Sequence, residues 1–152
     1  METGSSVSTL FFYEVSMESK ELVKEAFKAR ENSYSPYSGF SVGAALLCKN
    51  GKVYRGCNME NAAYSPGICA ERAAIYKAVS EGDKEFSKIA IVGGPTGGKI
   101  EKYAFPCGVC RQVMMEFVNP DKFIIVVAIS ENEYKEYTLK ELLPEGFGPD
   151  NL

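Results

Sequence analysis

Residues 69–81, CAERAAIYKAVSE, and residues 106–117, PCGVCRQVMMEF, each predict a short α-helix with a cysteine at its beginning. Alanine and valine recur in the first stretch with a helical period, and Gly82 follows where such a helix should end. In the second stretch, Pro106 suits a helix start. A backbone N–H at that position would have no hydrogen-bond partner within the helix, so its absence in proline costs nothing. Both stretches therefore place thiols at helix N-termini.

Apolar runs on either side of these helices predict strands. Asn50 and Gly51 favour a two-residue turn, so residues 40–48 and 52–57 are expected to form a hairpin. Later strands are expected at residues 88–92, 123–129 and 134–138, and further helices at residues 17–32 and 139–143. This order predicts an α/β fold with a mixed sheet of roughly five strands that is covered by helices.

Composition predicts one globular domain. The chain has 152 residues, of which 45% are hydrophobic and 24% are charged, which is enough to bury a single core. Met17 precedes the first predicted helix, so residues 1–16 are expected to be a loose N-terminal extension of a domain that spans residues 17–152. This extension lacks the basic region and the cleavage pattern of a signal peptide, so secretion is not expected.

Charge and hydropathy narrow the choice of partners. The net charge of -3 argues against a general phosphate-binding surface. The longest apolar run, residues 123–129, is far shorter than the roughly 20 residues that cross a bilayer. The five cysteines, two of them in a CxxC pair, are typical of metal or redox chemistry in a reducing compartment. We therefore expect a cytoplasmic protein that binds a small neutral molecule, with no nucleic acid and no membrane as partner.

Three of the five cysteines form a candidate metal site. The chain has no histidine, so thiolates or carboxylates must hold any metal. Cys107 and Cys110 are three residues apart, on one face of a helix, and Cys69 from the other helix can complete three ligands. Helix N-termini lower thiol pKa values and so favour metal binding. Three protein ligands leave one tetrahedral position open, which is typical of a catalytic zinc site.

Glu71 is the candidate catalytic residue. It follows Cys69 by two residues, and on a regular helix side chains two residues apart point to opposite flanks. Both can therefore reach one ion only if that ion lies beyond the end of the helix. A carboxylate there can take a proton from an attacking water and pass it to a substrate nitrogen. This arrangement indicates hydrolysis at an amidine-like carbon. Arg72, helped by Arg111, is expected to donate hydrogen bonds to the thiolates and to offset their charge.

The cysteines and glycines also allow other interpretations. An isolated CxxC pair is also typical of a structural zinc site or a redox pair, but no fourth cysteine or histidine lies in a partner motif. Cys48 and Cys57 can in principle complete a four-thiolate site; we expect them to be small core residues, because buried free cysteine is common. The glycines within residues 93–98 match no phosphate-binding pattern and are expected to form a plain loop.

Four motifs resemble the small nucleoside-salvage cytidine deaminases of the zinc-dependent cytidine/deoxycytidine deaminase superfamily, whose signature is (H/C)xE followed by PCxxC. They are SPYSGFSVGAALL (residues 35–47), NMENAAYSPGICAER (58–72), PCGVCRQV (106–113) and LLPEGF (142–147). The resemblance implies a three-layer α/β/α fold with Zn²⁺ as cofactor. It also implies a hydrolase that converts free cytidine and 2′-deoxycytidine to the uracil nucleosides and ammonia, in pyrimidine salvage.

The resemblance also gives roles to residues that the local sequence does not single out. It implies that Asn58 and Glu60 hydrogen-bond the ribose hydroxyls, that Phe40 packs against the nucleoside, and that the backbone of Ala70 faces the pyrimidine carbonyl. The chain is similar to the homotetrameric branch with three cysteine ligands, in which an aromatic side chain near the C-terminus enters a neighbouring subunit's site. Phe147 matches that position, so a homotetramer with shared active sites is expected.

Phe105 departs from the family pattern, in which a small residue commonly precedes the Pro-Cys pair. Its backbone carbonyl is expected to keep the family's role of receiving the leaving amine, whereas the width of the pocket and the substrate range stay open. Two alternatives remain at this point. One is a deaminase of polynucleotides or of a modified or antibiotic nucleoside, and the other is a zinc-stabilised binding protein without turnover.

Overall fold

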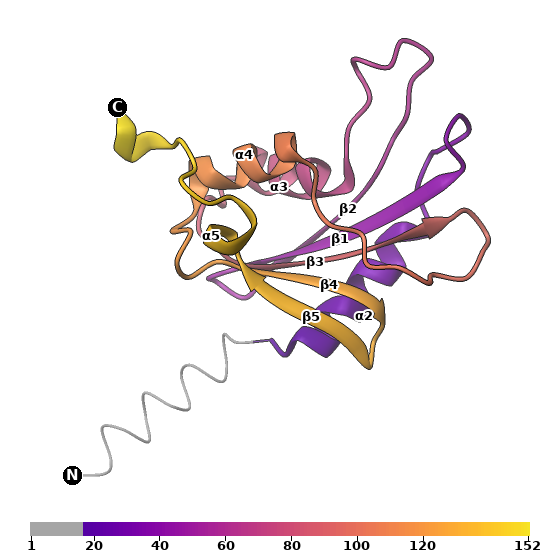
Figure 1. The fold of residues 1–152 in the computed structure, drawn as a ribbon, viewed down its shortest axis with the longest axis horizontal. Helices are drawn as coiled ribbons and strands as arrows, with labels where there is room; N and C mark the ends of the chain where they lie inside the picture. The colour runs from indigo at the N-terminus through magenta and orange to yellow at the C-terminus, as the bar shows by residue number, and fades with distance from the viewer. Residues whose placement is uncertain (1–16) are drawn as a thin grey trace.

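The computed structural model describes residues 17–152, in which one five-stranded sheet has the order β2-β1-β3-β4-β5 (Figure 1). The strands are β1 (Phe40–Cys48), β2 (Val53–Cys57), β3 (Phe86–Pro95), β4 (Ile124–Ser130) and β5 (Glu133–Thr138). The helices are α2 (Ser19–Arg30), α3 (Ala70–Ser80), α4 (Gly108–Phe117), α5 (Leu139–Leu142) and a 3-10 helix, η1 (Pro149–Asn151). The expected extension, residues 1–16, lies outside the described residues.

The sheet is mixed, as the order of the elements predicts. β3 and β4 pair in parallel, and the crossover between them contains α4. The pairs β1–β2, β1–β3 and β4–β5 are antiparallel. Gly51, in the turn between β1 and β2, has a φ of 90°, which glycine adopts without steric cost.

Helices cover both faces of the sheet and complete three layers. α2 packs on one face, where Leu22 and Val23 are fully buried. α3, α4 and α5 pack on the other face (Figure 1) and bury Ile75, Met114 and Leu139. The expected three-layer α/β/α fold is therefore confirmed. No helix in the described part of the chain is both long and apolar enough to cross a membrane.

Two glycines let helices approach the sheet at backbone distance. A Cβ atom at Gly56 would lie 2.4 Å from the carbonyl oxygen of Ala70 and 2.5 Å from the amide nitrogen of Ala74. A Cβ atom at Gly43 would lie 2.1 Å from the carbonyl oxygen of Ala26. Any other residue at these positions would force the backbone to move, so both α3 and α2 are fixed tightly against the sheet.

β3 is longer than the sequence predicts, because it runs through Gly93 and Gly94. Both glycines pair with the long apolar strand β1, so the expectation of a plain loop over residues 93–98 is wrong for its first part. A Cβ atom at Gly93 would lie 2.9 Å from the Cβ of Ala104 and 3.1 Å from the ring of Phe40. The missing side chain therefore makes room for two residues that line the pocket described next.

Candidate active site

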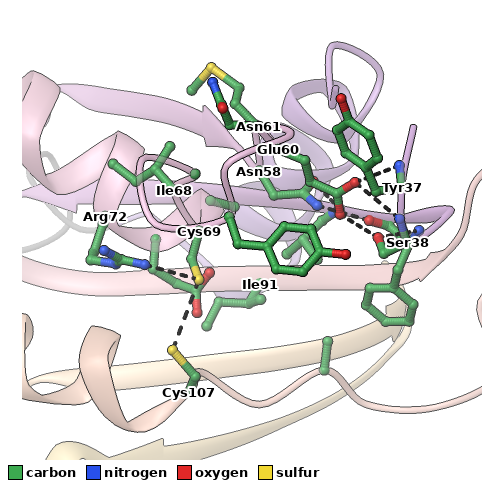
Figure 2. Close-up of a pocket in the computed structure, with 18 of the residues that line it drawn as sticks. Tyr37, Ser38, Asn58, Glu60, Asn61, Ile68, Cys69, Arg72, Ile91 and Cys107 are labelled. Atoms are coloured by element: carbon green, nitrogen blue, oxygen red, sulfur yellow. Dashed lines mark hydrogen bonds between the residues drawn. The ribbon is translucent and has the colours of Figure 1, made fainter. Parts of the chain in front are cut away.

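A cavity of about 520 Å³ lies between the start of β1, residues 58–72 and residues 104–107. Cys69, Arg72 and Cys107 lie at one end of it, and Tyr37, Ser38 and Glu60 lie at the other (Figure 2). Apolar side chains, among them Val42, Ile68 and Ile91, line much of the space between them. A concave, largely apolar pocket with a few convergent polar groups is the usual form of a small-molecule site.

The three expected metal ligands come together at one end of the pocket. Cys69 is the N-cap of α3, Cys107 is the N-cap of α4, and Cys110 lies in the first turn of α4. Their Sγ atoms lie within 4.8 Å of one another, and those of Cys69 and Cys107 are 3.9 Å apart. Zinc with four tetrahedral bonds of about 2.3 Å holds neighbouring sulfurs about 3.8 Å apart. The geometry of this three-cysteine cluster therefore fits zinc.

Hydrogen bonds and positive charge favour the thiolate form of Cys69, whereas the hydrogen bond with Cys69 and burial raise the pKa of Cys110. The hydrogen bond from Cys110, together with contacts to Arg72 and Cys107, lowers the pKa of Cys69 to about 5. Arg72 Nη2 donates to the Sγ of Cys69 over 3.4 Å. Within residues 17–152, the Nε of Arg72 is buried and has no hydrogen-bond partner. Arg72 thus lies where the sequence predicts a charge that offsets the thiolates.

Arg111 does not take part in this arrangement. Its Nε donates to the carbonyl oxygen of Pro106 over 2.6 Å, and its Nη1 donates to that of Leu142 over 2.5 Å. The expectation that Arg111 helps to balance the thiolates is therefore wrong. Its side chain instead joins the loop before Cys107 to α5, and this direction depends on tertiary packing that the local sequence does not encode.

Glu71 is buried beside the three-cysteine cluster. Only 4% of its surface is exposed, and it lines the pocket from the first turn of α3. Burial raises the pKa of Glu71 to about 7, and the neighbouring Cys69 thiolate acts in the same direction. A carboxyl group with such a pKa can both accept and donate a proton near neutral pH, as general acid–base catalysis requires.

The opposite end of the pocket is built by two segments that pair through their backbones. The N–H of Tyr34 donates to the carbonyl of Asn58 over 3.0 Å, and the N–H of Glu60 donates to the carbonyl of Tyr34 over 2.8 Å. The carboxylate of Glu60 accepts hydrogen bonds from the backbone N–H groups of Tyr37 and Ser38 and from the Ser38 hydroxyl. These bonds, the Ser38 hydroxyl first, lower the pKa of Glu60, so the residue offers an ionised acceptor.

Phe40, Asn58, Glu60 and Ala70 all line the pocket, as the resemblance implies. Ala70 is fully buried, whereas 42% of Phe40 is exposed. Tyr64, from the same region, lines the pocket as well and was not singled out by the sequence, nor were Tyr37 and Ser38. Their part in the site follows from the path of two irregular loops, which hydrophobic periodicity does not reveal.

Phe105 lines the pocket beside the end that holds the three-cysteine cluster, here called the metal end, and is 43% exposed. Its ring packs edge-on against that of Tyr137 in β5, with the ring centroids 5.5 Å apart. Such a contact contributes on the order of 1 kcal/mol beyond the buried area. The bulky side chain at this position is therefore anchored to the sheet.

Phe147 does not line this pocket. Its side chain is 57% exposed, and its carbonyl accepts a hydrogen bond from Gln112 Nε2 over 2.8 Å. The structure of one chain therefore separates Phe147 from the other four expected nucleoside-binding residues.

Cys48 and Cys57 lie outside the three-cysteine cluster. Cys48 is buried at the end of β1, and burial raises its pKa to about 11. Cys57 is half-buried, and burial raises its pKa too. Both residues therefore have the environment of small packed side chains, as expected for buried free cysteines.

Comparisons with known proteins all find similarity to cytidine deaminases. Residues 16–127 match the family model for the cytidine and deoxycytidylate deaminase zinc-binding region. A cytidine deaminase of Sporosarcina psychrophila is 44% identical over 136 residues, which are 90% of this chain and 96% of that protein. A cytidine deaminase of Halalkalibacterium halodurans is 43% identical over 90% of this chain and 98% of that protein. The crystal structure of a cytidine deaminase from Burkholderia pseudomallei superposes with a TM-score of 0.78 at 41% identity, covering 86% of this chain and 100% of that one.

Proposed function

This chain belongs to the family of zinc-binding cytidine and deoxycytidylate deaminases, and from that premise we propose that it hydrolyses free cytidine and 2′-deoxycytidine to the uracil nucleosides and ammonia. One observation carries the proposal. A buried carboxyl group, Glu71, lies beside the three-cysteine cluster in a pocket whose volume of about 520 Å³ suits a nucleoside.

Glu71 is the proton carrier in this reaction. Cys69, Cys107 and Cys110 would hold a zinc ion, which would act as a Lewis acid and lower the pKa of a water molecule. Glu71 accepts the proton that the attacking water gives up and donates it to N3 of the pyrimidine as C4 is attacked. It then moves the proton of the new C4 hydroxyl to the amine, which leaves as ammonia while C4 becomes a carbonyl. Arg72 donates to the thiolate of Cys69 and so balances part of the negative charge of three thiolates.

The remaining pocket residues bind and orient the nucleoside. Asn58 and Glu60 hydrogen-bond the ribose hydroxyls, and Phe40 packs against the bound molecule. The backbone of Ala70 faces the pyrimidine carbonyl, and the carbonyl of Phe105 receives the leaving amine. Their common position on the pocket surface supports these roles.

We further propose that the protein is a homotetramer of the cytoplasm that acts in pyrimidine salvage. Phe147 then completes the active site of a neighbouring subunit. This role is supported by a large aromatic side chain that is 57% exposed and does not line the pocket of its own chain. Five cysteines without a disulfide suit a reducing compartment.

Loss of the ultraviolet absorbance of cytidine tests the proposal directly. The purified protein should consume cytidine, should lose this activity with a zinc chelator, and should recover it when zinc is restored. A cytosine-containing oligonucleotide should not be consumed. A zinc-loaded protein that leaves cytidine intact would overturn the proposed function in favour of a zinc-stabilised binding protein.

A further inference from the structure

The side-chain amide of Asn58 is held on three sides by its own chain. Its Oδ1 accepts hydrogen bonds from the backbone N–H of Val42, over 2.8 Å, and from the hydroxyl of Ser33. Its Nδ2 donates to the carbonyl of Phe40 over 2.8 Å. An amide carries two N–H groups, and among the described residues only this one acceptor receives a bond from Nδ2.

These partners decide how Asn58 faces the pocket. The backbone N–H of Val42 can only donate, so the oxygen of the amide must lie toward it. The Ser33 hydroxyl gives the same oxygen a second donor. The remaining N–H of Asn58 is therefore the group that this residue, which lines the pocket, offers to a ligand.

Ser33 belongs to a chain of hydroxyl groups behind the pocket. Its Oγ lies 3.2 Å from that of Ser35, which lies 3.0 Å from that of Ser41. Ser41 in turn lies 2.6 Å from the hydroxyl of Thr96. Ser35 and Ser41 are buried, and a buried network in which the members bond one another is rigid.

Arg30 fixes the strand ends on which this network rests. Its Nε donates to the carbonyl of Ser41 over 2.8 Å, and its Nη2 donates to the carbonyls of Gly94 and Pro95 over 3.1 and 2.8 Å. Arg30 is the last residue of α2, which covers the face of the sheet opposite to α3 and α4 (Figure 1). One guanidinium from the far layer thus ties the start of β1 to the end of β3.

We propose that Ser33 is a positioning residue for substrate binding, which fixes Asn58 as a hydrogen-bond donor to the nucleoside, and that Arg30 holds the strand ends behind it. This role rests on the proposed function, because the ligand that Asn58 would bind is the nucleoside substrate. It affects the affinity for the nucleoside and not the proton transfer. Neither side chain lines the pocket, so both act through other residues.

The test compares Ser33→Ala, Ser33→Thr and a control, Ser80→Ala. Within residues 17–152, the hydroxyl of Ser80 bonds the carbonyl of Lys77 alone, at the end of α3 remote from the pocket. Loss of one hydrogen bond predicts a KM for cytidine about three- to tenfold higher in Ser33→Ala, with kcat within about twofold. Ser33→Thr keeps a hydroxyl and should restore KM, and Ser80→Ala should match the wild type. Arg30→Lys leaves Ser33 intact but removes the guanidinium that bonds the carbonyls of both strands. This variant should also raise the KM for cytidine.

A double-mutant cycle separates positioning from a merely structural effect. When Asn58 is already replaced by alanine, Ser33→Ala should change KM no further, because its target is gone. Equal effects of Ser33→Ala with and without Asn58 would overturn the proposal, as would an unchanged KM in Ser33→Ala. Wild-type turnover of cytidine in the same assay tests the proposed function separately; an inactive wild-type enzyme would refute that function and this role with it.

Discussion

Cys69 and Glu71 belong to the same turn of α3, yet their acidities are inverted. An ordinary thiol is a much weaker acid than an ordinary carboxyl group. Here the pKa of Cys69 is lowered to about 5, chiefly by its hydrogen bond from Cys110, whereas burial raises the pKa of Glu71 to about 7. These shifts support the roles proposed for the two residues, Cys69 as a metal ligand and Glu71 as the proton carrier.

Glu71→Gln is expected to keep the fold and the zinc content while it removes nearly all turnover. A neutral amide preserves the shape of the side chain but cannot carry the proton, and general acid–base help is worth about 10²- to 10⁴-fold. Steady-state kinetics on cytidine, with metal analysis of the same sample, measures both properties. A Gln variant that keeps a third of the wild-type kcat would eliminate the proposed role.

The three-cysteine cluster predicts about one zinc per chain. Replacement of Cys69, Cys107 or Cys110 by serine should abolish stoichiometric zinc, because each supplies one of three ligands. Cys48→Ser and Cys57→Ser are the matched controls and should retain it, since both thiols lie outside the cluster. Metal analysis after gel filtration gives the result, and loss of zinc in either control would refute the ligand assignment.

Local spacing was sufficient to predict the residues at the metal end of the pocket. Cys69 and Glu71 at one helix start, and a CxxC pair at another, are chemically informative without a structure. The contacts of Arg111 were not predictable, because they depend on where α5 packs. The hydrogen bond between Ser33 and Asn58 was not predictable either, because it joins two loops whose residues are 25 positions apart in the sequence.

At the scale of elements, Gly56 sets the position of α3 and thereby of the metal end. Gly56→Ala should destabilise the protein by about 1–3 kcal/mol, because the new methyl group would collide with the backbone of α3. It should also weaken zinc binding, since the displaced helix start carries Cys69. Thermal unfolding and a competitive chelator titration measure the two effects.

Gly108→Ala is the matched control for stability, because a Cβ atom there would meet nothing within 4 Å. It should leave the melting temperature unchanged or raise it, since alanine is the better helix former. Equal melting temperatures for Gly56→Ala and the wild type would contradict the close approach of β2 and α3.

The elements differ in how well their sequence defines them. β1 was predicted with its observed limits, because a mostly apolar run, residues 40–48, ends at a favourable turn. β3 was predicted too short, because Gly93 and Gly94 are read locally as turn residues although pairing with β1 keeps them in the sheet. Tertiary pairing overrides local preference at such positions.

At the scale of the whole molecule, Phe147→Ala is expected to raise KM for cytidine while zinc content stays constant. The reason is the proposed contact with a nucleoside in a neighbouring subunit, because Phe147 lies away from the pocket of its own chain. Kinetics and sedimentation of the variant, compared with the wild type, measure affinity and assembly. A wild-type monomer with full activity at assay concentration would refute the shared site.

Chelation of the metal should loosen one layer of the molecule more than the other. The caps of α3 and α4 converge on the three-cysteine cluster, whereas α2 is held to the sheet by Leu22, Val23 and the contacts of Arg30. We expect amide hydrogen exchange to rise at the first turns of α3 and α4 and to change little in α2. Exchange measured by mass spectrometry, with and without chelator, checks this; a uniform rise would contradict it.

The same convergence has a consequence for the order of folding. Cys69 and Cys107 are 38 residues apart in the sequence, and β3 lies between them. Joining the two thiols early would cost the entropy of closing that loop, whereas after β3 has paired with β1 the two helix starts already face each other. We therefore expect the three-cysteine cluster to form after β1 and β3 have paired, so that the ability to hold zinc follows the formation of this part of the sheet.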